Sequence, residues 1–303
     1  MVSIINWNNR LATNKCLAGI ASIEKAKQPD IILVDNASSE ELSVDKKLVE
    51  RLASLRIVKN RRNLGFAGGH NPNIKTAKEA DYDYIVLLNN DTQIIDKALF
   101  EELAAALDEQ PQALGANPTI FASISPDTVW FAGGRLSFIT GGVSHIGAGG
   151  RFSHRGNPAP TGFLTGGCLA IALKRAELPQ LQLSEDYFLY WEDADWSARA
   201  RRAGFQLLYV PKAKVLHHVS SGLGLRSANY IYYNIRNHFL FIRKNIRPML
   251  WPIAWTGVLL ITAKYKFNIF FKYKTGRISA WAGLWAGWRD GLLGRGGPGG
   301  RTV

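Results

Sequence analysis

The stretch Ile85-Val-Leu-Leu-Asn-Asn-Asp91 decides the fold, because four consecutive apolar residues are followed at once by two amides and a carboxylate. A solid apolar run of this length is typical of a strand buried on both faces of a parallel sheet. Residues 2–5, 31–34 and 55–58 have the same form. Helical patterns lie between these runs, so the sequence predicts an α/β fold whose parallel sheet is covered on both faces.

The remaining elements are predicted with less regular patterns. We expect helices from about residue 10 to 23 and over 40–54, 73–80 and 98–108. Residues 115–160, which are rich in Gly, Ser and Pro, favour irregular strands and loops that can carry acceptor specificity. Residues 161–220 return to the core.

Each predicted strand ends in polar residues. These are Asn8, Asp35 with Asn36, the segment 63–71, and Asn89 to Asp91. Ligands of parallel α/β sheets bind outside the carboxyl ends of the strands. Four strands that deliver Asn, Asp and Gly to one edge therefore predict a binding site there.

Two of these strand ends suit a nucleotide, although each has a structural alternative. Asp35 can accept hydrogen bonds from a ribose or a pyrimidine, but it can equally cap a helix or a turn. The glycines between residues 65 and 69 let the backbone approach a phosphate closely. Their spacing fits neither the dinucleotide fingerprint nor a P-loop, since no Gly-Lys-Ser/Thr ending follows.

Asp91 is a candidate metal ligand, because a cation that bridges a diphosphate needs only one or two protein carboxylates. His217 or His218, directly after an apolar run, can supply a second ligand. The alternatives are an ordinary strand-end Asp and a structural His.

The stretch from Phe188 to Trp196 packs three carboxylates, Glu192, Asp193 and Asp195, among aromatic residues. Carboxylates beside so much apolar surface are costly to desolvate unless they line a wet cleft or meet cations. One of them is thus a natural general base. The structural alternative is a helix N-terminus, where acidic residues are favoured.

Composition describes an ordinary globular protein: 303 residues, 47% apolar and 20% charged. Two cysteines give no disulfide framework and favour a reducing compartment. We find no internal repeat and expect no secretory signal, because the chain opens directly with a strand pattern.

The net charge of +13 is concentrated after residue 219, where 13 Lys and Arg stand against one Asp. The apolar stretch 251–263 is too short to span a bilayer, and aromatics alternate with lysines after it. This pattern favours association with an anionic membrane surface, with a helical bundle packed on the core as the alternative. No nucleic-acid-binding module accompanies the tail, so we expect no nucleic acid partner.

Eight blocks of the sequence together resemble the inverting glycosyltransferases of family 2, in particular their bacterial rhamnosyltransferase-like branch. They occur in the family's order over roughly residues 2–245: IINWNN, ILVDNASSE, NLGFAGGHN, YIVLLNNDT, TGGCLAIA, FLYWEDADWSARARRAG, YVPKAKVLHH and YYNIRNHFLFIRKN. The resemblance implies a GT-A fold, in which a Rossmann-like nucleotide-binding half is fused to an acceptor-binding half.

The resemblance also implies roles for particular residues. Asn8, Asp35 and Asn36 would contact the nucleoside. The residues along the nucleotide and diphosphate would be Asn63, Gly65, Phe66, Gly68, Gly69, Asn71, Asn89 and Asn90. Asp91 stands in the metal-binding DxD motif and would ligate Mg²⁺ or Mn²⁺ together with His217, with His218 as the fallback. Asp193 matches the catalytic base and Glu192 lies beside it, while the acceptor side would include Gly166, Trp191, Asp195 and Arg199.

Two segments depart from the branch. His70 and Pro72-Asn73 border the expected nucleotide site, so the donor can differ from the usual dTDP-rhamnose. Residues 177–184 lack the usual Gly-Phe-Asp lead into the catalytic block, which affects the acceptor side.

The sequence thus predicts a metal-dependent inverting glycosyltransferase that moves a sugar, with rhamnose as one candidate, from a dTDP- or UDP-linked donor to a surface-glycan or lipid-linked hydroxyl. The alternative is a non-catalytic sugar-nucleotide-binding or scaffold protein of a glycan assembly complex. We expect a GT-A domain over 1–220, a helical basic region over 221–293 and a disordered tail over 294–303. The expected location is the cytoplasm, at the inner face of the plasma membrane.

Overall fold

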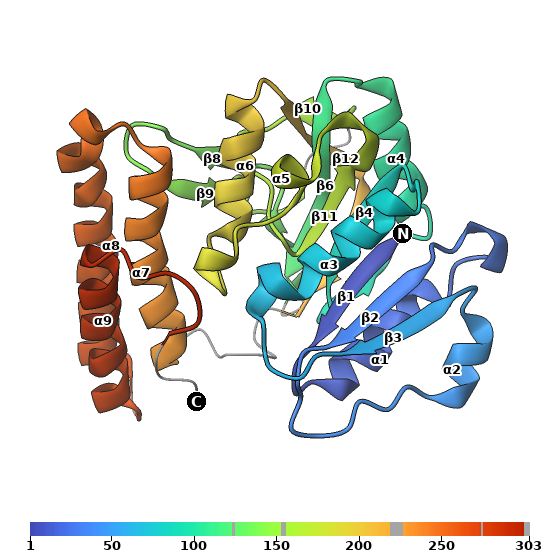
Figure 1. Cartoon of the computed structure of the whole chain (residues 1–303), viewed down its shortest axis with the longest axis horizontal. Coiled ribbons are helices and arrows are strands. Elements are labelled where there is room, and N and C mark those ends of the chain that lie inside the picture. The colour runs from blue at the N-terminus through green and yellow to red at the C-terminus, as the bar shows by residue number, and fades with distance from the viewer. Residues whose placement is uncertain (123–124, 153–155, 219–226, 274, 300–303) are drawn as a thin grey trace.

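A computed structural model describes residues 1–122, 125–152, 156–218, 227–273 and 275–299. Its centre is a mixed sheet with the strand order β10-β12-β6-β11-β4-β1-β2-β3 (Figure 1). Three helices of the C-terminal region stand together at the opposite end of the molecule from β3. The predicted α/β fold class is confirmed.

The first half of the sheet is parallel, as predicted. It consists of β1 (Val2–Asn6), β2 (Ile31–Asp35), β3 (Leu55–Lys59) and β4 (Tyr84–Asn89). The helices between these strands are α1 (Arg10–Ile20), α2 (Lys46–Arg51) and α3 (Gly65–Glu79). In Figure 1, α3 crosses in front of this half of the sheet and α1 lies behind it.

The second half of the sheet departs from the purely parallel prediction. β11 (Cys168–Ala172) runs antiparallel to both β4 and β6 (Ala113–Ala122), whereas β12 (Gln206–His217) runs parallel to β6. The short strands are β5 (Thr92–Ile94), β7 (Ser125–Phe131), β8 (Gly134–Leu136), β9 (Val143–His145) and β10 (Ala159–Pro160). The helices of this half are α4 (Leu99–Glu109), α5 (Leu178–Leu181) and α6 (Glu192–Arg202), with a short 3-10 turn, η3 (Glu185–Tyr187), before α6.

The glycine-rich segment is helical rather than a loop, so the helix expected over 73–80 begins eight residues earlier, at Gly65. Its glycines permit close packing on β1. A Cβ on Gly69 would lie 2.5 Å from Cδ1 of Ile5. Pro72 also lies inside α3, near its middle.

The C-terminal region consists of α7 (Ala228–Asn245), α8 (Trp251–Phe271) and α9 (Arg277–Leu292). Residues 294–299 of the expected disordered tail are described, and Gly297 N–H donates to the Asp186 carbonyl. The rest of that tail, 300–303, and the expected boundary at 220 lie outside the described residues. No helix of the described part is long and apolar enough to cross a membrane.

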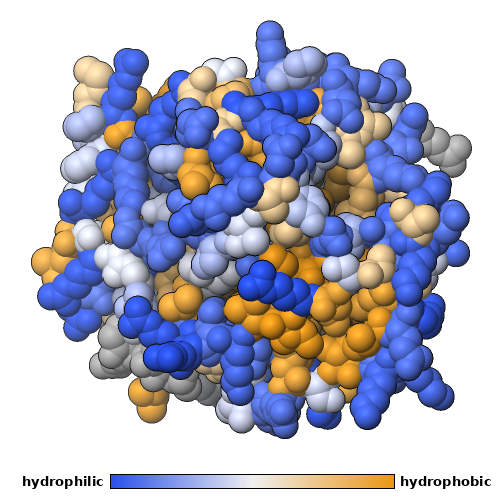
Figure 2. All heavy atoms as spheres, turned by 45° about the vertical axis from the view of Figure 1, so that its right-hand side comes forward, coloured by the Kyte–Doolittle hydropathy of each residue, from blue (hydrophilic) through white to orange (hydrophobic). Residues whose placement is uncertain are grey.

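Figure 2 brings forward the side of the molecule on the right of Figure 1. Hydrophilic side chains cover most of this face, and apolar side chains gather in one area of its lower half. The most exposed apolar residues of α8 and α9 belong to the other end of the molecule.

Candidate active site

Asp35 and Asn36, at the end of β2, are buried. Asn36 is engaged in the fold: its amide donates to Asn63 Oδ1 and to the Gly65 carbonyl, and its oxygen accepts from Leu64 N–H. Asp35 Oδ1 accepts from Ser38 N–H. Asn36 therefore shapes the turn that leads into α3, while Asp35 stands at the strand end where a nucleoside was expected.

Asn8 follows β1 and is exposed, with a left-handed φ of 52°. Its oxygen accepts hydrogen bonds from the N–H and hydroxyl of Ser39. Asn8 thus joins the loop after β1 to the loop after β2. The two loops form one edge over the parallel strands.

The N-terminus of α3 forms the next part of this edge. Gly65 has a φ of +72°, which favours glycine, and a Cβ there would lie 2.9 Å from the Phe188 carbonyl carbon. Phe66 N–H donates to the Phe188 carbonyl over 2.8 Å. A Cβ on Gly68 would lie 2.9 Å from Leu64 Cβ, so the first turn of α3 leaves room only for hydrogen.

Asn71, expected along the diphosphate, is instead engaged with residues 183–185. Its amide donates to the Leu183 carbonyl and to Glu185 Oε1, and its oxygen accepts from Leu183 N–H. His70 and Asn73, expected to border the nucleotide, are buried against β1, where both contact the Ser3 hydroxyl. The residues His70 and Asn73, which differ from those usual in the rhamnosyltransferase-like branch, therefore serve the packing of α3 on β1.

Asp91, two residues after the end of β4, lies beside His217, the last residue of β12. Asp91 Oδ1 lies 3.0 Å from His217 Nε2, and both side chains are largely buried. Two metal ligands, each about 2.1 Å from a cation and at right angles to one another, lie about 3.0 Å apart. The pair therefore fits a divalent cation.

Within the described residues, no group of three or more His, Cys, Asp or Glu side chains could hold a metal. A cation at Asp91 and His217 would thus need phosphate and water oxygens as further ligands, as Mg²⁺ does in nucleotide sites. His218, the fallback ligand, turns toward Gln93, with 3.4 Å between Nε2 and Oε1. Asn90 donates to the Thr13 hydroxyl and holds the loop after β4 on α1.

Gly166 and Gly167 lie between the segment of Asp91 and the carboxylates of α6. Gly167 O accepts from Asn89 N–H at the end of β4, and Gly166 N–H donates to Asp193 Oδ2 over 3.0 Å. Burial is the main cause that raises the pKa of the Tyr190 hydroxyl, and the charges of Glu192 and Asp91 add to it. The charges of Glu192 and Asp91 therefore both act on the Tyr190 hydroxyl.

Glu192 and Asp193 open α6 and differ in their surroundings. Burial, and then the charge of Asp193, raises the pKa of Glu192 well above its ordinary value. Among the described residues, Glu192 Oε2 has no hydrogen-bond partner. Burial also raises the pKa of Asp193, but hydrogen bonds from Gly166 and Ala194 N–H groups oppose the shift. A half-buried carboxylate with a raised pKa suits a general base.

Asp195 and Arg199, expected on the acceptor side, point into the fold. Asp195 is 2% exposed and accepts from Arg199 Nε over 2.8 Å. Its other oxygen accepts from the Tyr187 hydroxyl and the Asn245 amide. This pairing with a cation and two neutral donors makes Asp195 a structural residue.

Trp191 has a left-handed backbone and stacks on His238, with 4.4 Å between ring centroids. It is half-buried beside Glu192. An aromatic face at this place can pack against a sugar ring.

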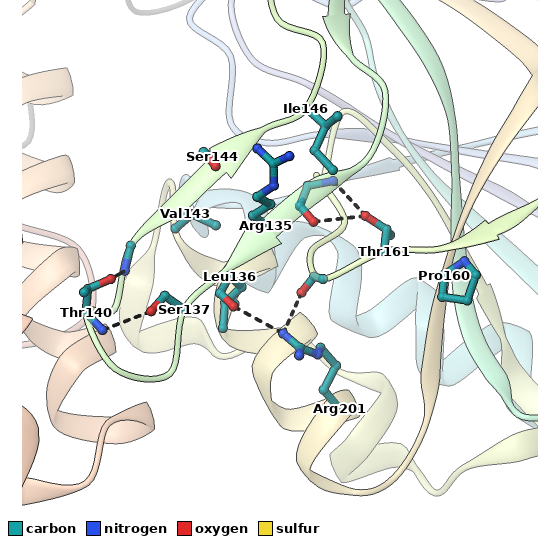
Figure 3. Close-up of a pocket in the computed structure, with 13 residues that line it drawn as sticks. Arg135, Leu136, Ser137, Thr140, Val143, Ser144, Ile146, Pro160, Thr161 and Arg201 are labelled. Carbon is teal, nitrogen blue, oxygen red and sulfur yellow. Dashed lines mark hydrogen bonds between the residues drawn. The ribbon is translucent and has the colours of Figure 1, made fainter. Parts of the chain in front are cut away.

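A shallow hollow of about 780 Å³ lies between the β8–β9 hairpin, residues 160–162 and Arg201 (Figure 3). The Arg201 guanidinium donates to the carbonyls of Leu136 and Gly162. Arg201 is eight residues after Asp193, or about 12 Å along α6. The hollow is therefore separate from the carboxylates, and its guanidinium is engaged with backbone.

Comparison with known proteins agrees with this geometry. The family profile "Glycosyl transferase family 2" matches residues 2–134. An N-acetylglucosaminyl-diphospho-decaprenol L-rhamnosyltransferase of Mycobacterium tuberculosis is 27% identical over 263 residues, which cover 78% of this chain and 81% of that protein. Over residues 2–134 the chain is thus similar to the family 2 glycosyltransferases. A dTDP-rhamnosyl transferase, RfbF, of Shigella flexneri is 24% identical over 122 residues, covering 35% of this chain and 41% of that protein.

Solved structures of other glycosyltransferases share the GT-A fold. GalNAc-T7 with UDP, GalNAc and Mn²⁺ superposes with a TM-score of 0.60 at 15% identity, covering 80% of this chain. This chain spans only 47% of that one. The mannosyltransferase PcManGT from Pyrobaculum calidifontis, in complex with GDP-Man and Mn²⁺, gives 0.51 at 12% identity, covering 97% of this chain and 84% of that one.

The sequence analysis did not identify three residues that adjoin this candidate site. Trp130 of β7 packs edge-on against the His217 ring at 4.8 Å, and Tyr190 lies near both acidic groups. Thr165 hydrogen-bonds to Asp193 through its side chain. The last stands one residue before Gly166, in a block that had already been singled out.

Proposed function

We propose that this glycosyltransferase is a metal-dependent, inverting enzyme that transfers a sugar from a nucleotide diphosphate to a hydroxyl of a lipid-linked acceptor. The observation that carries the proposal is the pair of sites on either side of Gly166 and Gly167. Gly166 N–H donates to Asp193, and the Gly167 carbonyl accepts from Asn89 and Thr92, which flank Asp91 of the Asp91–His217 pair. Rhamnose is the proposed sugar, because both named relatives are rhamnosyltransferases.

Asp193 would act as the base. Its carboxylate takes the proton of the acceptor hydroxyl while the hydroxyl oxygen attacks the anomeric carbon. The bond between that carbon and the diphosphate oxygen breaks on the opposite face, so the configuration inverts and the nucleoside diphosphate leaves. The Gly166 N–H bond orients the carboxylate, and the raised pKa makes it a stronger base.

Asp91 and His217 would hold the divalent cation, Mg²⁺ or Mn²⁺. When bound, the cation supplies positive charge to the leaving diphosphate. Stabilisation of developing charge of this kind is worth a few powers of ten in rate. The N-terminus of α3 would add the partial positive charge of a helix end near the same diphosphate, while the N–H groups of Gly65 and Phe66 are engaged by Asn63 Oδ1 and the Phe188 carbonyl.

Donor binding can be measured by thermal shift of the full chain with dTDP, UDP, GDP and CMP, each with and without Mn²⁺. A nucleotide at a hundredfold excess over its Kd stabilises by about 2.7 kcal/mol, or on the order of 5 °C. We expect one pyrimidine diphosphate to stabilise the protein and Mn²⁺ to enhance its effect. Stabilisation by none of the four would contradict the proposal.

The base assignment is tested with Asp193→Asn. Transfer should be abolished while nucleotide affinity stays nearly unchanged, because the carboxylate serves the acceptor. Wild-type protein that binds nucleotide but transfers no sugar to any polyprenyl-diphosphate sugar would favour the scaffold alternative. A variant that keeps transfer but loses nucleotide binding would overturn the role of Asp193.

The outer face of α8 is the proposed contact with an anionic membrane. Its inner face, which includes Ala254, Val258 and Ile269, is buried against the neighbouring helices. Its outer face is apolar as well: Leu260 is 73% exposed and Phe271 66%. Exposed apolar side chains that gather on one helix face mark a contact with a membrane or another protein.

The charges around this face favour a lipid surface over a second protein copy. Among the described residues, four basic side chains are exposed on or just after α8, namely Lys264, Lys266, Lys272 and Arg277. The one acidic residue of the three C-terminal helices, Asp290, is paired with Arg289 and Arg295. Exposed aromatics among lysines suit the headgroup region of an anionic bilayer. The lipid-linked acceptor in the name of the mycobacterial relative fits the same location.

Sedimentation with phosphatidylglycerol or phosphatidylcholine vesicles tests this contact. We expect binding to the anionic vesicles only, lost in Leu260→Asp. Leu11→Asp is the matched control, because Leu11 on α1 is 74% exposed. Equal binding of both variants, or a change of oligomeric mass in Leu260→Asp without loss of vesicle binding, would contradict it.

A further inference from the structure

The loop before the catalytic carboxylates has an unusual backbone. Phe188, Tyr190 and Trp191 all have left-handed φ values, of 60°, 66° and 73°. Leu189 N–H donates to the Tyr187 carbonyl over 2.7 Å, which closes a γ-turn at Phe188. Residues other than glycine adopt such angles at a cost, and they persist only where surrounding contacts impose them.

Asn237 of α7 supplies part of those contacts. Its side chain is fully buried. Its amide nitrogen lies 2.8–2.9 Å from three loop carbonyl oxygens, those of Tyr187, Leu189 and Tyr190. These carbonyls point at one nitrogen because of the left-handed turns between them. The amide is thus matched to the strained form of the loop.

Arg236 completes the arrangement. Its Nε donates to Asn237 Oδ1 over 2.8 Å, which turns the Asn237 amide nitrogen toward the loop. Its Nη2 donates to the Tyr187 and Asp186 carbonyls, and its Nη1 to the Gly297 carbonyl. None of these partners carries a charge, although Arg236 is fully buried. Burying a cation against neutral carbonyls is expensive unless its donors are well used.

The same loop reaches the donor side of the site. The Phe188 carbonyl accepts from Phe66 N–H in the first turn of α3. The loop is therefore held by α3 on one side and by Arg236 and Asn237 on the other. Asp193 follows its last strained residue by two positions.

We propose that Arg236 and Asn237 are positioning residues, which hold residues 187–191 in the strained form that places Asp193 against the acceptor. This inference rests on the proposed function, since it assigns Asp193 the role of base. It makes α7 a part of the catalytic machinery and gives a role to the RN pair of the last sequence block.

Asn237→Ala in the full chain tests the inference. We expect kcat to fall about 10²-fold, the size of a displacement of about 1 Å in a catalytic group. KM for the donor and Kd for the nucleoside diphosphate should stay within about twofold. Asn73→Ala is the matched control, because Asn73 is a buried amide that donates to Ser3 on β1. A fall in kcat no larger than in this control would overturn the inference.

Hydrogen–deuterium exchange separates this inference from the proposed function. Amides of residues 187–193 should exchange faster in Asn237→Ala than in wild type, while those of β6 stay unchanged. If Asn237→Ala shows faster exchange but the wild type transfers no sugar, Arg236 and Asn237 do hold residues 187–191, and the proposed function is refuted. Unchanged exchange in Asn237→Ala would refute the inference that Arg236 and Asn237 hold residues 187–191. Arg236→Lys, which keeps the charge but loses the fork of donors, gives the same test if Asn237→Ala does not fold.

Discussion

Replacement of Gly65 by alanine probes the contact between α3 and Phe188, in the loop of residues 187–191 that precedes Asp193. The left-handed φ of +72° costs alanine about 1–2 kcal/mol. The new Cβ would also lie 2.7 Å from Phe188 Cδ2 and 2.9 Å from the Phe188 carbonyl carbon. Overpacking of this kind costs about 1–3 kcal/mol. Moving the carbonyl away weakens its hydrogen bond from Phe66 N–H, a further loss of about 1 kcal/mol. The expected total is about 3–6 kcal/mol.

Gly149→Ala isolates the steric part of this loss. Gly149 has a φ of +80°, and a Cβ there would meet nothing within 4 Å, so only the backbone cost of about 1–2 kcal/mol applies. Urea titration of both variants should therefore give free energies of unfolding that differ by about 2–4 kcal/mol, with Gly65→Ala the less stable. Equal losses in the two variants would refute the argued contact with Phe188.

Three further predictions concern charge. Glu192→Gln should raise stability at pH 8 more than at pH 5. The buried Glu192 carboxyl has a raised pKa. The free energy of unfolding of the wild type therefore falls by about 1.4 kcal/mol per pH unit as pH rises above about 4.5, until the raised pKa is reached. An equal gain in stability of Glu192→Gln at both pH values would contradict this. Burial lowers the pKa of His70 to about 3 and that of His238 to about 4. Because both imidazoles stay neutral in the fold, each lowers the free energy of unfolding as pH falls below 6.5, by about 2 kcal/mol at pH 5. Between pH 8 and pH 5, His238→Gln should therefore lose about 2 kcal/mol less than wild type in urea titrations, and an equal loss in both proteins would contradict this. Asp91→Ala should abolish the Mn²⁺ enhancement of nucleotide binding in thermal shift, whereas enhancement that persists would place the cation elsewhere.

The first four strands were predicted almost to the residue, because each is an uninterrupted apolar run between polar ends. The long strand β6 was not, since Gly115 and Pro118 in Ala113–Ala122 suggest a loop. Tertiary packing overrides this local pattern and makes the segment a strand. Glycine is used at position 115 because the Trp196 ring packs there, and a Cβ on Gly115 would lie 2.8 Å from that ring. The helical start of α3 was missed for the same reason, since glycines there serve close packing.

Part of the candidate site followed from residue types at strand ends. Asp91 and His217 were proposed as a pair although 126 positions separate them, and the structure brings them within 3.0 Å. The sequence could not show which polar residues are engaged internally. Asn36, Asn71 and Asp195 have the chemistry of ligand-binding groups, but each has a hydrogen-bond partner from a distant segment, namely Asn63, Leu183 and Asn245. Arg236 and Asn237 could not be identified from the sequence for the same reason, because their partners in residues 187–190 lie far away along the chain.

The distance along the chain between the catalytic loop and its supports has a bearing on how this enzyme is made. The loop ends at Trp191, whereas its carbonyls bond to Asn237 and to Arg236, which also holds Gly297. A ribosome that adds 5–20 residues per second reaches Gly297 roughly 5–20 s after Trp191. The parallel strands β1 to β4 can therefore fold during synthesis, whereas the loop before Asp193 gains the full set of these contacts only after Gly297 has been added.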